Sequence, residues 1–320
     1  HQIVGALDKL ITDQYRIVSL AEASPGDLQA LLADGQSDVA RGVRYALTKL
    51  LPFAVTSNLQ GTAVAEARYD ADQFSELYLA DRAEYFALAM ERNQVDADAS
   101  AVAPVAGSGP RAYLDYGPAG TDVLLAGWQP PPAFAGGSGP LDDHRQFHFG
   151  SDAGEVLTGG AREDHLYGGA GDDQLRGGGG ADLLDGGSGA DTYYFETGDG
   201  HDVILDRDNA GDVLVLNGTV ITQEDITRIA GAEVFTDAQG NHYFHDDWAN
   251  TLLIQLAGSD DSLTLHHVED EDSGHLGIDF WHTAEQVDPG DMKVIDVGDG
   301  GDIGELELKP IFESMRELNI

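Results

Sequence analysis

Apolar residues recur at helical spacing through the N-terminal third of the chain, residues 1–97. Ser24 followed by Pro25 is typical of a helix start, because serine caps the first turn and proline fits its first position. Further helices are predicted over residues 38–51 and 73–92, where apolar side chains fall on one face. The pattern therefore predicts a helical domain of three or four packed helices.

Strand-like alternation replaces the helical spacing in residues 98–149, after a small, proline-containing linker. Two short strands are predicted over residues 111–117 and 121–128, on either side of a Gly-Pro-Ala-Gly turn. A further strand, RQFHFG, places Phe147 and Phe149 on one face. We expect these two phenylalanines to cap the open end of a β-stack, where unpaired ladder groups would invite aggregation.

Residues 150–194 repeat every nine positions without an insertion. The first position is always glycine, at Gly150, Gly159, Gly168, Gly177 and Gly186. The sixth position is always acidic, at Glu155, Asp164, Asp173, Asp182 and Asp191. The eighth is apolar or aromatic, at Leu157, Leu166, Leu175, Leu184 and Tyr193. A flexible, low-complexity Gly/Asp linker is the alternative, and the unbroken register argues against it.

This nonapeptide resembles the RTX repeats of calcium-dependent secreted bacterial proteins, the hemolysin-type calcium-binding family. The resemblance implies a parallel β-roll in which two blocks make one full turn. Glycine pairs allow tight turns with positive φ, and the eighth residue points inward from a very short strand. A single block buries almost nothing, so several must stack before the core is continuous.

Two blocks per turn would place acids eighteen residues apart one above another: Asp164 over Asp182, Asp173 over Asp191, and Glu155 over Asp173. Strands stack about 4.8 Å apart, where two carboxylates repel by roughly 3 kcal/mol at an effective dielectric of about 20. A hard divalent cation reverses the sign of this interaction, so the pattern favours calcium, with two or three ions per chain.

Backbone carbonyls of the glycine turns are further candidate ligands, at Gly159, Gly168, Gly177 and Gly186. Two blocks depart from the pattern, because Glu155 replaces aspartate and Arg162 replaces the fourth-position glycine of its block. The pairs that use only aspartate are therefore preferred over the pair that includes Glu155.

The charge of the chain excludes some partners. The formal net charge is −40, which argues against nucleic acid or an anionic membrane as an electrostatic partner. Stoichiometric cation binding and salt adaptation both explain such acidity, and the ordered aspartates favour the first. The chain has no cysteine, so disulfides and thiolate metal sites are impossible. It also has no run of eighteen apolar residues that would predict a transmembrane helix.

No catalytic residue is predicted within the chain. It contains neither a G-x-S-x-G elbow nor an H-E-x-x-H motif, and capping explains Ser37 and Ser75 at helix starts better than nucleophilicity does. The N-terminus lacks a starting methionine and a signal peptide, so we expect either a fragment or a processed product of a longer protein. The helical segments resemble regions that precede RTX tails in lipase-like exported proteins. That resemblance would place a hydrolase upstream of His1, and an upstream adhesin is a further possibility.

The chain after the array continues the β-pattern without strict register. Asp202 follows Asp191 by eleven residues, which indicates a degenerate last turn rather than a sixth block. Asp199 and Asp202 are candidates for one further ion, although we prefer solvated turn acids as their interpretation. Several predicted strands follow, one pair joined by a loop over residues 237–241. In the RTX family such a flank caps the roll.

The sequence as a whole predicts an α+β chain with four parts. These are a helical domain (1–97), a linker with short strands (98–149), a calcium-binding parallel β-roll (150–205), and a β-rich capping flank with a C-terminal tail (206–320). The resemblance implies a secreted bacterial protein whose roll folds on calcium after passing the bacterial export machinery. The alternative function is the C-terminal part of a secreted, lipase-like hydrolase.

Overall fold

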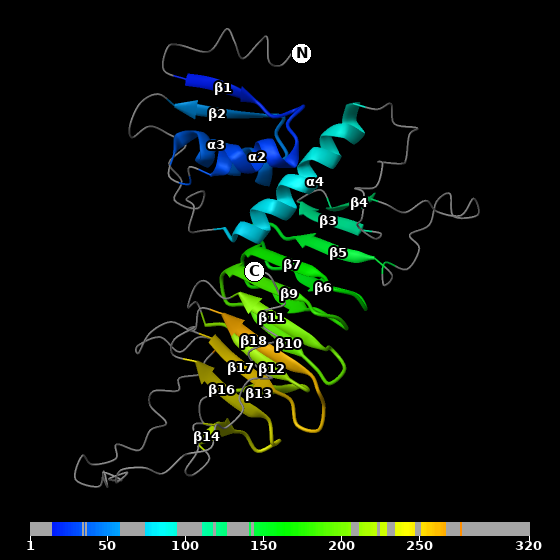
Figure 1. Cartoon of the computed structure of the whole chain (residues 1–320), viewed down its shortest axis with the longest axis vertical. Helices are drawn as coiled ribbons and strands as arrows, with labels where there is room; N and C mark the ends of the chain where they lie inside the picture. The colour runs from blue at the N-terminus through cyan, green and yellow to red at the C-terminus, as the bar shows by residue number, and fades with distance from the viewer. Residues whose placement is uncertain are drawn as a thin grey trace, which may run out of the picture. The chain divides into compact units, whose positions relative to one another are not determined.

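The structure, a computed structural model, is described for most of residues 15–266 (Figure 1). The described residues are 15–33, 35, 37–57, 74–94, 111–117, 120–126, 141, 144–205, 211–222, 225–228, 234–246, 251–266 and 276. The chain divides into two units, residues 1–283 and 284–320, and the second lies outside the described residues. The predicted C-terminal tail therefore falls outside them too.

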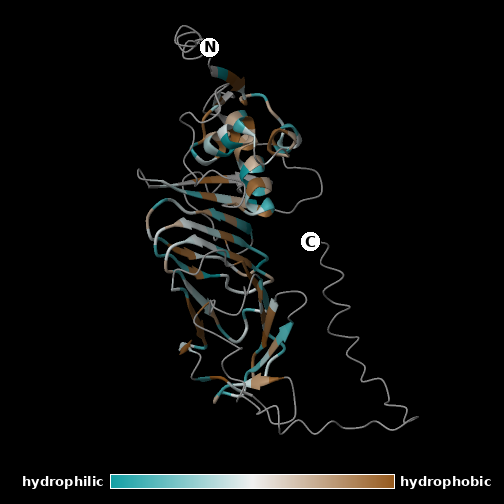
Figure 2. Cartoon of the chain, turned by 90° about the vertical axis from the view of Figure 1, so that its left-hand side faces the viewer, coloured by the Kyte–Doolittle hydropathy of each residue, from teal (hydrophilic) through white to brown (hydrophobic). Residues whose placement is uncertain are grey.

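Three helices are described in the N-terminal part, which confirms the prediction of helices there. They are α2 (Pro25–Leu32), α3 (Asp38–Thr48) and α4 (Glu76–Gln94). Serine caps all three: Ser24 forms a capping box, while Ser37 and Ser75 accept backbone N–H groups of the first turn. Figure 2 shows hydrophobic and hydrophilic residues alternating around these helices, as expected for elements that bury one side.

The helical prediction missed one feature of this part. Strand β1 (Tyr15–Ser19) pairs antiparallel with β2 (Phe53–Ser57). The residues between the two strands form α2 and α3, so the pairing joins segments far apart in sequence. The third helix, α4, packs with α2 and α3 around a core that includes Leu28, Leu47 and Phe86.

Two sheets make up the remaining described fold, and both are parallel through the repeat. The smaller has the order β13-β12-β10-β8-β6. Its strands are β6 (Val156–Thr158), β8 (Gln174–Arg176), β10 (Thr192–Phe195), β12 (Val213–Leu216) and β13 (Thr219–Ile221). The larger has the order β14-β15-β16-β17-β18-β11-β9-β7-β5-β3-β4. Its repeat strands are β7 (His165–Ala170), β9 (Leu183–Ser188) and β11 (His201–Leu205).

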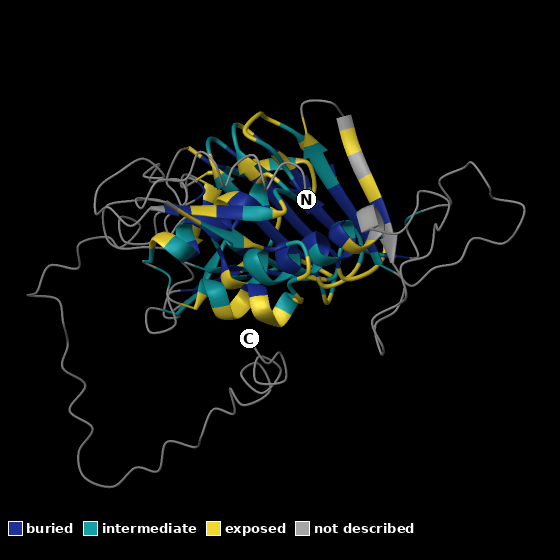
Figure 3. Cartoon of the chain, turned by 90° about the horizontal axis from the view of Figure 1, so that it is seen from above, coloured by how far each residue is buried: buried dark blue, intermediate teal, exposed yellow. Residues whose placement is uncertain are grey.

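The chain alternates between the two sheets once per block, so each full turn takes two blocks. Leu166 in β7 faces Leu184 in β9, while Leu157 in β6 faces Leu175 in β8. Every eighth-position side chain has at most 1% of its surface exposed, and all of them join one apolar core. The prediction that the eighth position points inward is confirmed. Figure 3 shows buried residues running along the strands and exposed residues gathering at the turns.

One end of the roll is extended by strands before the array. These are β3 (Arg111–Gly117), β4 (Gly120–Ala126) and β5 (Arg145–Phe149). Strand β5 pairs parallel with both β7 and β3, and β4 forms the outer edge. The expectation that Phe147 and Phe149 cap the open end is wrong. Both pack in a separate apolar cluster with Tyr85 of α4, and β3 and β4 pair beyond them instead.

The flank after the array continues both sheets. Its strands in the larger sheet are β14 (Thr227–Arg228), β15 (Phe235–Thr236), β16 (His242–Asp246), β17 (Thr251–Gln255) and β18 (Ser262–His266). The four strands β15 to β18 form an antiparallel meander, with the predicted turn at residues 237–241 closed by the Asp237 side chain. Strand β18 then pairs parallel with β11, the last repeat strand of this sheet.

Candidate metal centre

The sixth-position acids form two ladders of side-chain-to-backbone hydrogen bonds. In the first, the backbone N–H of Gln146 donates to Asp164 Oδ1 (2.6 Å), that of Asp164 to Asp182 Oδ1 (2.7 Å), and that of Asp182 to Asp202 Oδ1 (3.0 Å). Each Oδ1 thus connects its own turn to the preceding one. The predicted stacking of Asp164 over Asp182 is present in the structure.

The second ladder runs along the opposite sheet in the same way. The N–H of Glu155 donates to Asp173 Oδ1 (2.6 Å), that of Asp173 to Asp191 Oδ1 (2.9 Å), and that of Asp191 to Asp212 Oδ1 (2.6 Å). Three of these acids belong to the predicted candidates, and Asp212 is the addition. All the aspartates in the two ladders are at most 5% exposed.

The second carboxylate oxygen distinguishes three of these acids. Oδ2 of Asp173, Asp182 and Asp202 is buried and has no hydrogen-bond partner. A buried carboxylate oxygen without a partner is costly, because the oxygen loses its hydration and gains nothing in return. A bound cation would remove this cost. The three oxygens are therefore the strongest geometric signal of a metal site in the described part of the chain.

The pKa values of these carboxyl groups also indicate that burial disfavours their charged form. Burial, followed by the charges of neighbouring acids, raises the pKa of Asp173 and of Asp182 to about 7. Burial and the charge of Asp182 raise the pKa of Asp202 to about 8. Metal-free protein would therefore carry protons on these groups near neutral pH, and a divalent cation would compete with those protons.

Glycine at the second and fourth positions shapes the turns beside these three oxygens. Before Asp182, for example, both Gly178 (φ 93°) and Gly180 (φ 151°) have positive φ. The same is true before Asp173 and Asp202. The first-position glycines serve differently, since a Cβ on Gly177 would collide with Asp182 Oδ2.

The predicted candidates Gly159, Gly168 and Gly186 repeat this arrangement with the acid of their own block. A Cβ on Gly168 would also collide with the carbonyl oxygen of Gly186, one turn away. First-position glycines thus keep open the space in which carboxylate and carbonyl oxygens converge. Their role as carbonyl ligands stays a prediction.

The first two blocks are different, because their acids are satisfied by their own turns. Oε2 of Glu155 accepts the N–H of Ser151 (2.9 Å), and Oδ2 of Asp164 accepts the N–H of Gly160 (2.5 Å). Neither Gly160 nor Arg162 has positive φ, so the second block turns differently from the third and fourth. Burial raises the pKa of Asp164 only to about 6, because both N–H groups favour its charged form.

The structure corrects two expectations about residues 197–205. They form the equivalent of a sixth block, since Asp202 joins the first ladder and Ile204 pairs with Leu184 in the core. A two-residue insertion, Phe195 and Glu196, breaks the nine-residue count but not the stacking. The preferred interpretation of Asp202 as a solvated turn acid is also wrong, because only 1% of its surface is exposed.

The donors present suit calcium better than a transition metal. Within the described residues, no three His, Cys, Asp or Glu side chains converge as a ready metal-ligand set. A cation at the unpartnered carboxylates would therefore need backbone carbonyl oxygens as well, and an all-oxygen set from carboxylates and carbonyls is what calcium accepts. The chain also lacks cysteine, which excludes thiolate ligands.

No helix in the described part of the chain is both long and apolar enough to span a bilayer. Comparison with curated proteins finds no match. Among solved structures, the chain is similar to the solution structure of the AlgE6R3 subunit from the Azotobacter vinelandii mannuronan C5-epimerase. The identity is 23%, the alignment covers 49% of this chain and 89% of that one, and the TM-score is 0.17. At that TM-score the similarity carries no argument about fold or function.

The family comparison is specific to the array. The model for the RTX calcium-binding nonapeptide repeat (4 copies) matches residues 149–184, 158–193 and 173–204. The third match extends through Asp202, in agreement with the sixth block seen in the structure. Residues 149–204 of this chain are therefore RTX calcium-binding nonapeptide repeats.

Proposed function

We propose that the roll is a module that folds by binding calcium. The observation that carries the proposal is the set of three buried, unpartnered carboxylate oxygens on Asp173, Asp182 and Asp202. They support a count of three ions, within the two or three expected from the sequence. Bound calcium would supply the positive charge that these buried carboxylates lack.

Without calcium, two costs oppose folding of the array. Each stacked pair of ionised acids repels by roughly 3 kcal/mol at an effective dielectric of about 20. Each glycine also loses about 1–2 kcal/mol of backbone entropy when its turn becomes ordered. Glycine is the most frequent residue of the repeat, so the second cost recurs in every turn. The binding free energy of calcium then becomes folding free energy.

We further propose that the chain belongs to a secreted bacterial protein. The family resemblance supports this, as does an acidic, cysteine-free composition with a net charge of −40. A metal-free array that stays unfolded would suit passage through a narrow export channel. Outside the cell, at about millimolar calcium, even sites with dissociation constants of about 10⁻⁴–10⁻³ M would fill.

Isothermal titration calorimetry of the full chain tests the proposed function. Chelated protein titrated with calcium should bind two or three ions with release of protons, because the raised pKa values leave the metal-free acids partly protonated. Magnesium at the same concentration should not reproduce the signal, since it demands smaller, near-octahedral sites. Absence of calcium binding, or equal binding of magnesium, would refute the proposal.

A further inference from the structure

Helix α4 is buried on two sides, and the two sides belong to different cores. One side contributes Ala83, Phe86 and Met90 to the core shared with α2 and α3. The other contributes Tyr85 and Leu88 to the cluster that contains strand residues of the larger sheet. A helix that is apolar on two sides must pack against a partner on each side to remove both apolar surfaces from water. Helix α4 thus connects the N-terminal core to the roll.

The roll-facing side of α4 is an aromatic contact. The Tyr85 ring stacks on Phe149 of β5, with centroids 5.6 Å apart, and the Tyr78 ring meets the edge of Tyr167 of β7 at 5.2 Å. The Arg82 guanidinium lies 4.8 Å from the centroid of the Phe149 ring. Such pairs stabilise beyond the area they bury, so this contact is specific rather than a general apolar patch.

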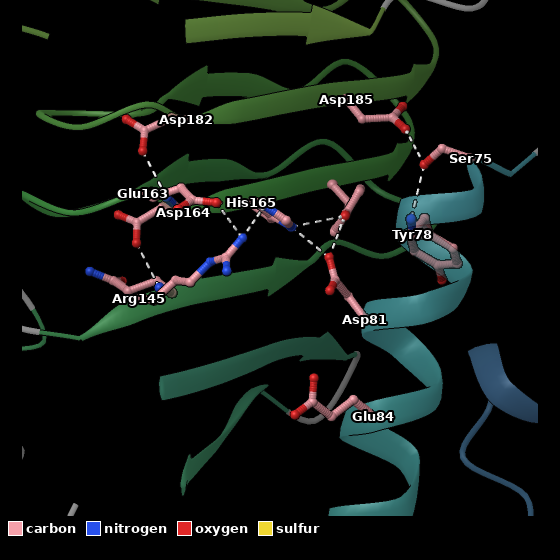
Figure 4. A network of polar contacts seen from close by, with 12 residues as sticks. Ser75, Tyr78, Asp81, Glu84, Arg145, Glu163, Asp164, His165, Asp182 and Asp185 are labelled. Carbon is pink, nitrogen blue, oxygen red and sulfur yellow. Dashed lines mark hydrogen bonds and ion pairs between the residues drawn. The ribbon is translucent and has the colours of Figure 1, made fainter. Parts of the chain in front are cut away.

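Polar contacts fix the position of the helix on the sheet (Figure 4). The Tyr167 hydroxyl donates to Asp81 Oδ2 (2.6 Å), and His165 Nδ1 lies 2.6 Å from the same oxygen. Just before the first residue of α4, the Ser75 hydroxyl donates to Asp185 Oδ2 (3.2 Å) in β9. These contacts pair one helix with two successive turns of the repeat.

The strand residues that α4 contacts come partly from β3 and β5, which precede the repeat, and partly from the repeat itself. His165 and Tyr167 are the seventh and ninth residues of the second block, and Leu183 and Asp185 hold the same positions in the fourth. On the opposite sheet, Val156 holds the seventh position and is 65% exposed. Among the residues that the structure describes, the outward repeat positions that contact a helix are therefore those of the larger sheet.

The ladder acids and the contact residues are neighbours along the same strands. Asp164 precedes His165 directly, and Asp182 precedes Leu183. The acid points toward the glycine turn, while the next residues present the surface that α4 contacts. A strand that is not formed cannot present Tyr167 and Asp185 on one face, since that face exists only through the strand's alternation.

We infer that calcium binding to the roll builds the docking surface for α4, and so orders the N-terminal helical part against the repeat. The inference rests on the proposed function and adds its consequence. The partner of the calcium-folded surface is a segment of the same chain. The ladder acids and the α4 contact surface are thereby linked through one element with two states, the folded and the unfolded repeat sheet. Calcium binds at the ladder acids, and α4 becomes ordered at the contact surface.

Hydrogen exchange measured by mass spectrometry on the full chain tests this inference. In calcium, peptides from residues 76–94 and from 150–205 should both be protected. In chelator, both should lose protection, and exchange in 76–94 should accelerate by at least about tenfold, the effect of losing one or two aromatic pairs. The two segments should respond with the same calcium midpoint.

A variant on the helix separates docking from calcium binding. Tyr85→Ala removes the α4 ring that contacts Phe149 and leaves every ladder acid unchanged. Residues 150–205 should therefore still gain protection with calcium. Protection of 76–94 should then be low and independent of calcium. Tyr194→Ala is the matched control, because Tyr194 lies on β10 of the smaller sheet and contacts Arg176 instead. It should leave calcium-dependent protection of α4 intact.

The outcomes distinguish the two proposals. If 150–205 responds to calcium while 76–94 does not, the docking inference is overturned and the proposed function stands. If neither segment responds, both are overturned. If Tyr194→Ala uncouples α4 as strongly as Tyr85→Ala does, the contact described here is not the link and the inference fails.

Discussion

The first two blocks of the array and the next two share a nine-residue pattern but differ in how their acids are satisfied. In blocks one and two, the second oxygen of Glu155 and of Asp164 accepts an N–H from its own turn. In blocks three and four, the second oxygen of Asp173 and of Asp182 is buried without a partner. The acid is the sixth residue in all four blocks, so its position alone does not make a cation site.

The difference lies in the glycines. Blocks three and four have positive φ at both the second and the fourth position, whereas block two has Arg162 at the fourth position and positive φ at neither. A turn without the left-handed glycines directs its own N–H at the carboxylate and satisfies it. In blocks three and four, left-handed glycines accompany a second oxygen that has no hydrogen-bond partner. They are not sufficient by themselves, because block five has positive φ at Gly187 and Gly189 and Asp191 is not one of the three unpartnered acids. The turn before Asp202 is of the open kind, with Gly198 and Gly200 both at positive φ.

The largest effect is expected from Asp173→Asn combined with Asp182→Asn. Asparagine keeps an acceptor for the Oδ1 ladder but removes the charge, so it separates a structural role from a calcium role. We expect calcium-induced folding to be lost, at a cost of about 4 kcal/mol if calcium is present at a thousand times its dissociation constant. Thermal melting in calcium measures this, and a melting curve like that of the unsubstituted chain would contradict it.

A large effect is also expected from Gly180→Ala. A Cβ there would collide with the carbonyl of Arg162 in the neighbouring turn, and φ is positive as well. The sum of left-handed strain and overpacking is about 2–5 kcal/mol. Gly198→Ala is the matched control, since its φ is positive but nothing lies within 4 Å of the added Cβ. In urea unfolding with calcium present, the free energy of unfolding should be much lower for Gly180→Ala than for Gly198→Ala. An equal loss of unfolding free energy in the two variants would show that the turns do not pack as described.

An intermediate effect is expected from pH in the absence of calcium. The folded-state pKa values of Asp173 and Asp182, about 7, and of Asp202, about 8, lie above the ordinary value of 3.8. The folded roll therefore holds protons that the unfolded chain releases, so stability that is fully present below the ordinary carboxyl pKa of 3.8 is lost progressively as pH rises toward the folded-state pKa values of about 7 and about 8. The slope is about 1.4 kcal/mol per pH unit for each retained proton.

Circular dichroism of chelated protein between about pH 4.5 and about pH 8.5, from near the ordinary carboxyl pKa to just above the raised values, measures this dependence. The β signal should be greater at the acid end, and saturating calcium should restore it at the alkaline end. A chelated protein that gains β structure as the pH rises would have the opposite sign and would contradict the account.

The smallest effect is expected from Asp164→Asn. Two backbone N–H groups, those of Gln146 and Gly160, donate to this carboxylate, and asparagine can accept only on its single oxygen. The mismatch should cost about 1–3 kcal/mol while leaving the number of bound calcium ions unchanged. Calorimetry measures the number of bound calcium ions. We expect Asp182→Asn to lose one ion, and the loss of an ion in Asp164→Asn as well would contradict the difference between the two kinds of block.

Much of the array could be predicted from the sequence, because the nine-residue repeat alone determines which side chains point inward and which acids stack. The buried eighth positions and the eighteen-residue stacking follow from glycine and leucine spacing. The nine-residue count fails after the fifth block, where Phe195 and Glu196 are inserted. Asp202 and Asp212 join the ladders at spacings of 20 and 21 residues rather than 18, and nothing in a strict nine-residue count recovers them.

The features that depend on long-range pairing were beyond the sequence patterns. Nothing local marks β1 and β2 as partners, since they pair across two helices. Phe147 and Phe149 were recognised as one strand face, but only the packing of α4 shows what that face contacts. The difference between satisfied and open acids also needed backbone coordinates, although Arg162 at a glycine position was a signal that the second block departs from the rest.

Far-UV circular dichroism of the full chain, in chelator and then with calcium raised to about 10 mM, well above expected dissociation constants, tests the central claim most directly. The account predicts a cooperative gain of β signal that returns to its starting level when chelator is added again. A spectrum that is already fully β-structured in chelator at neutral pH, and does not change with calcium, would contradict it.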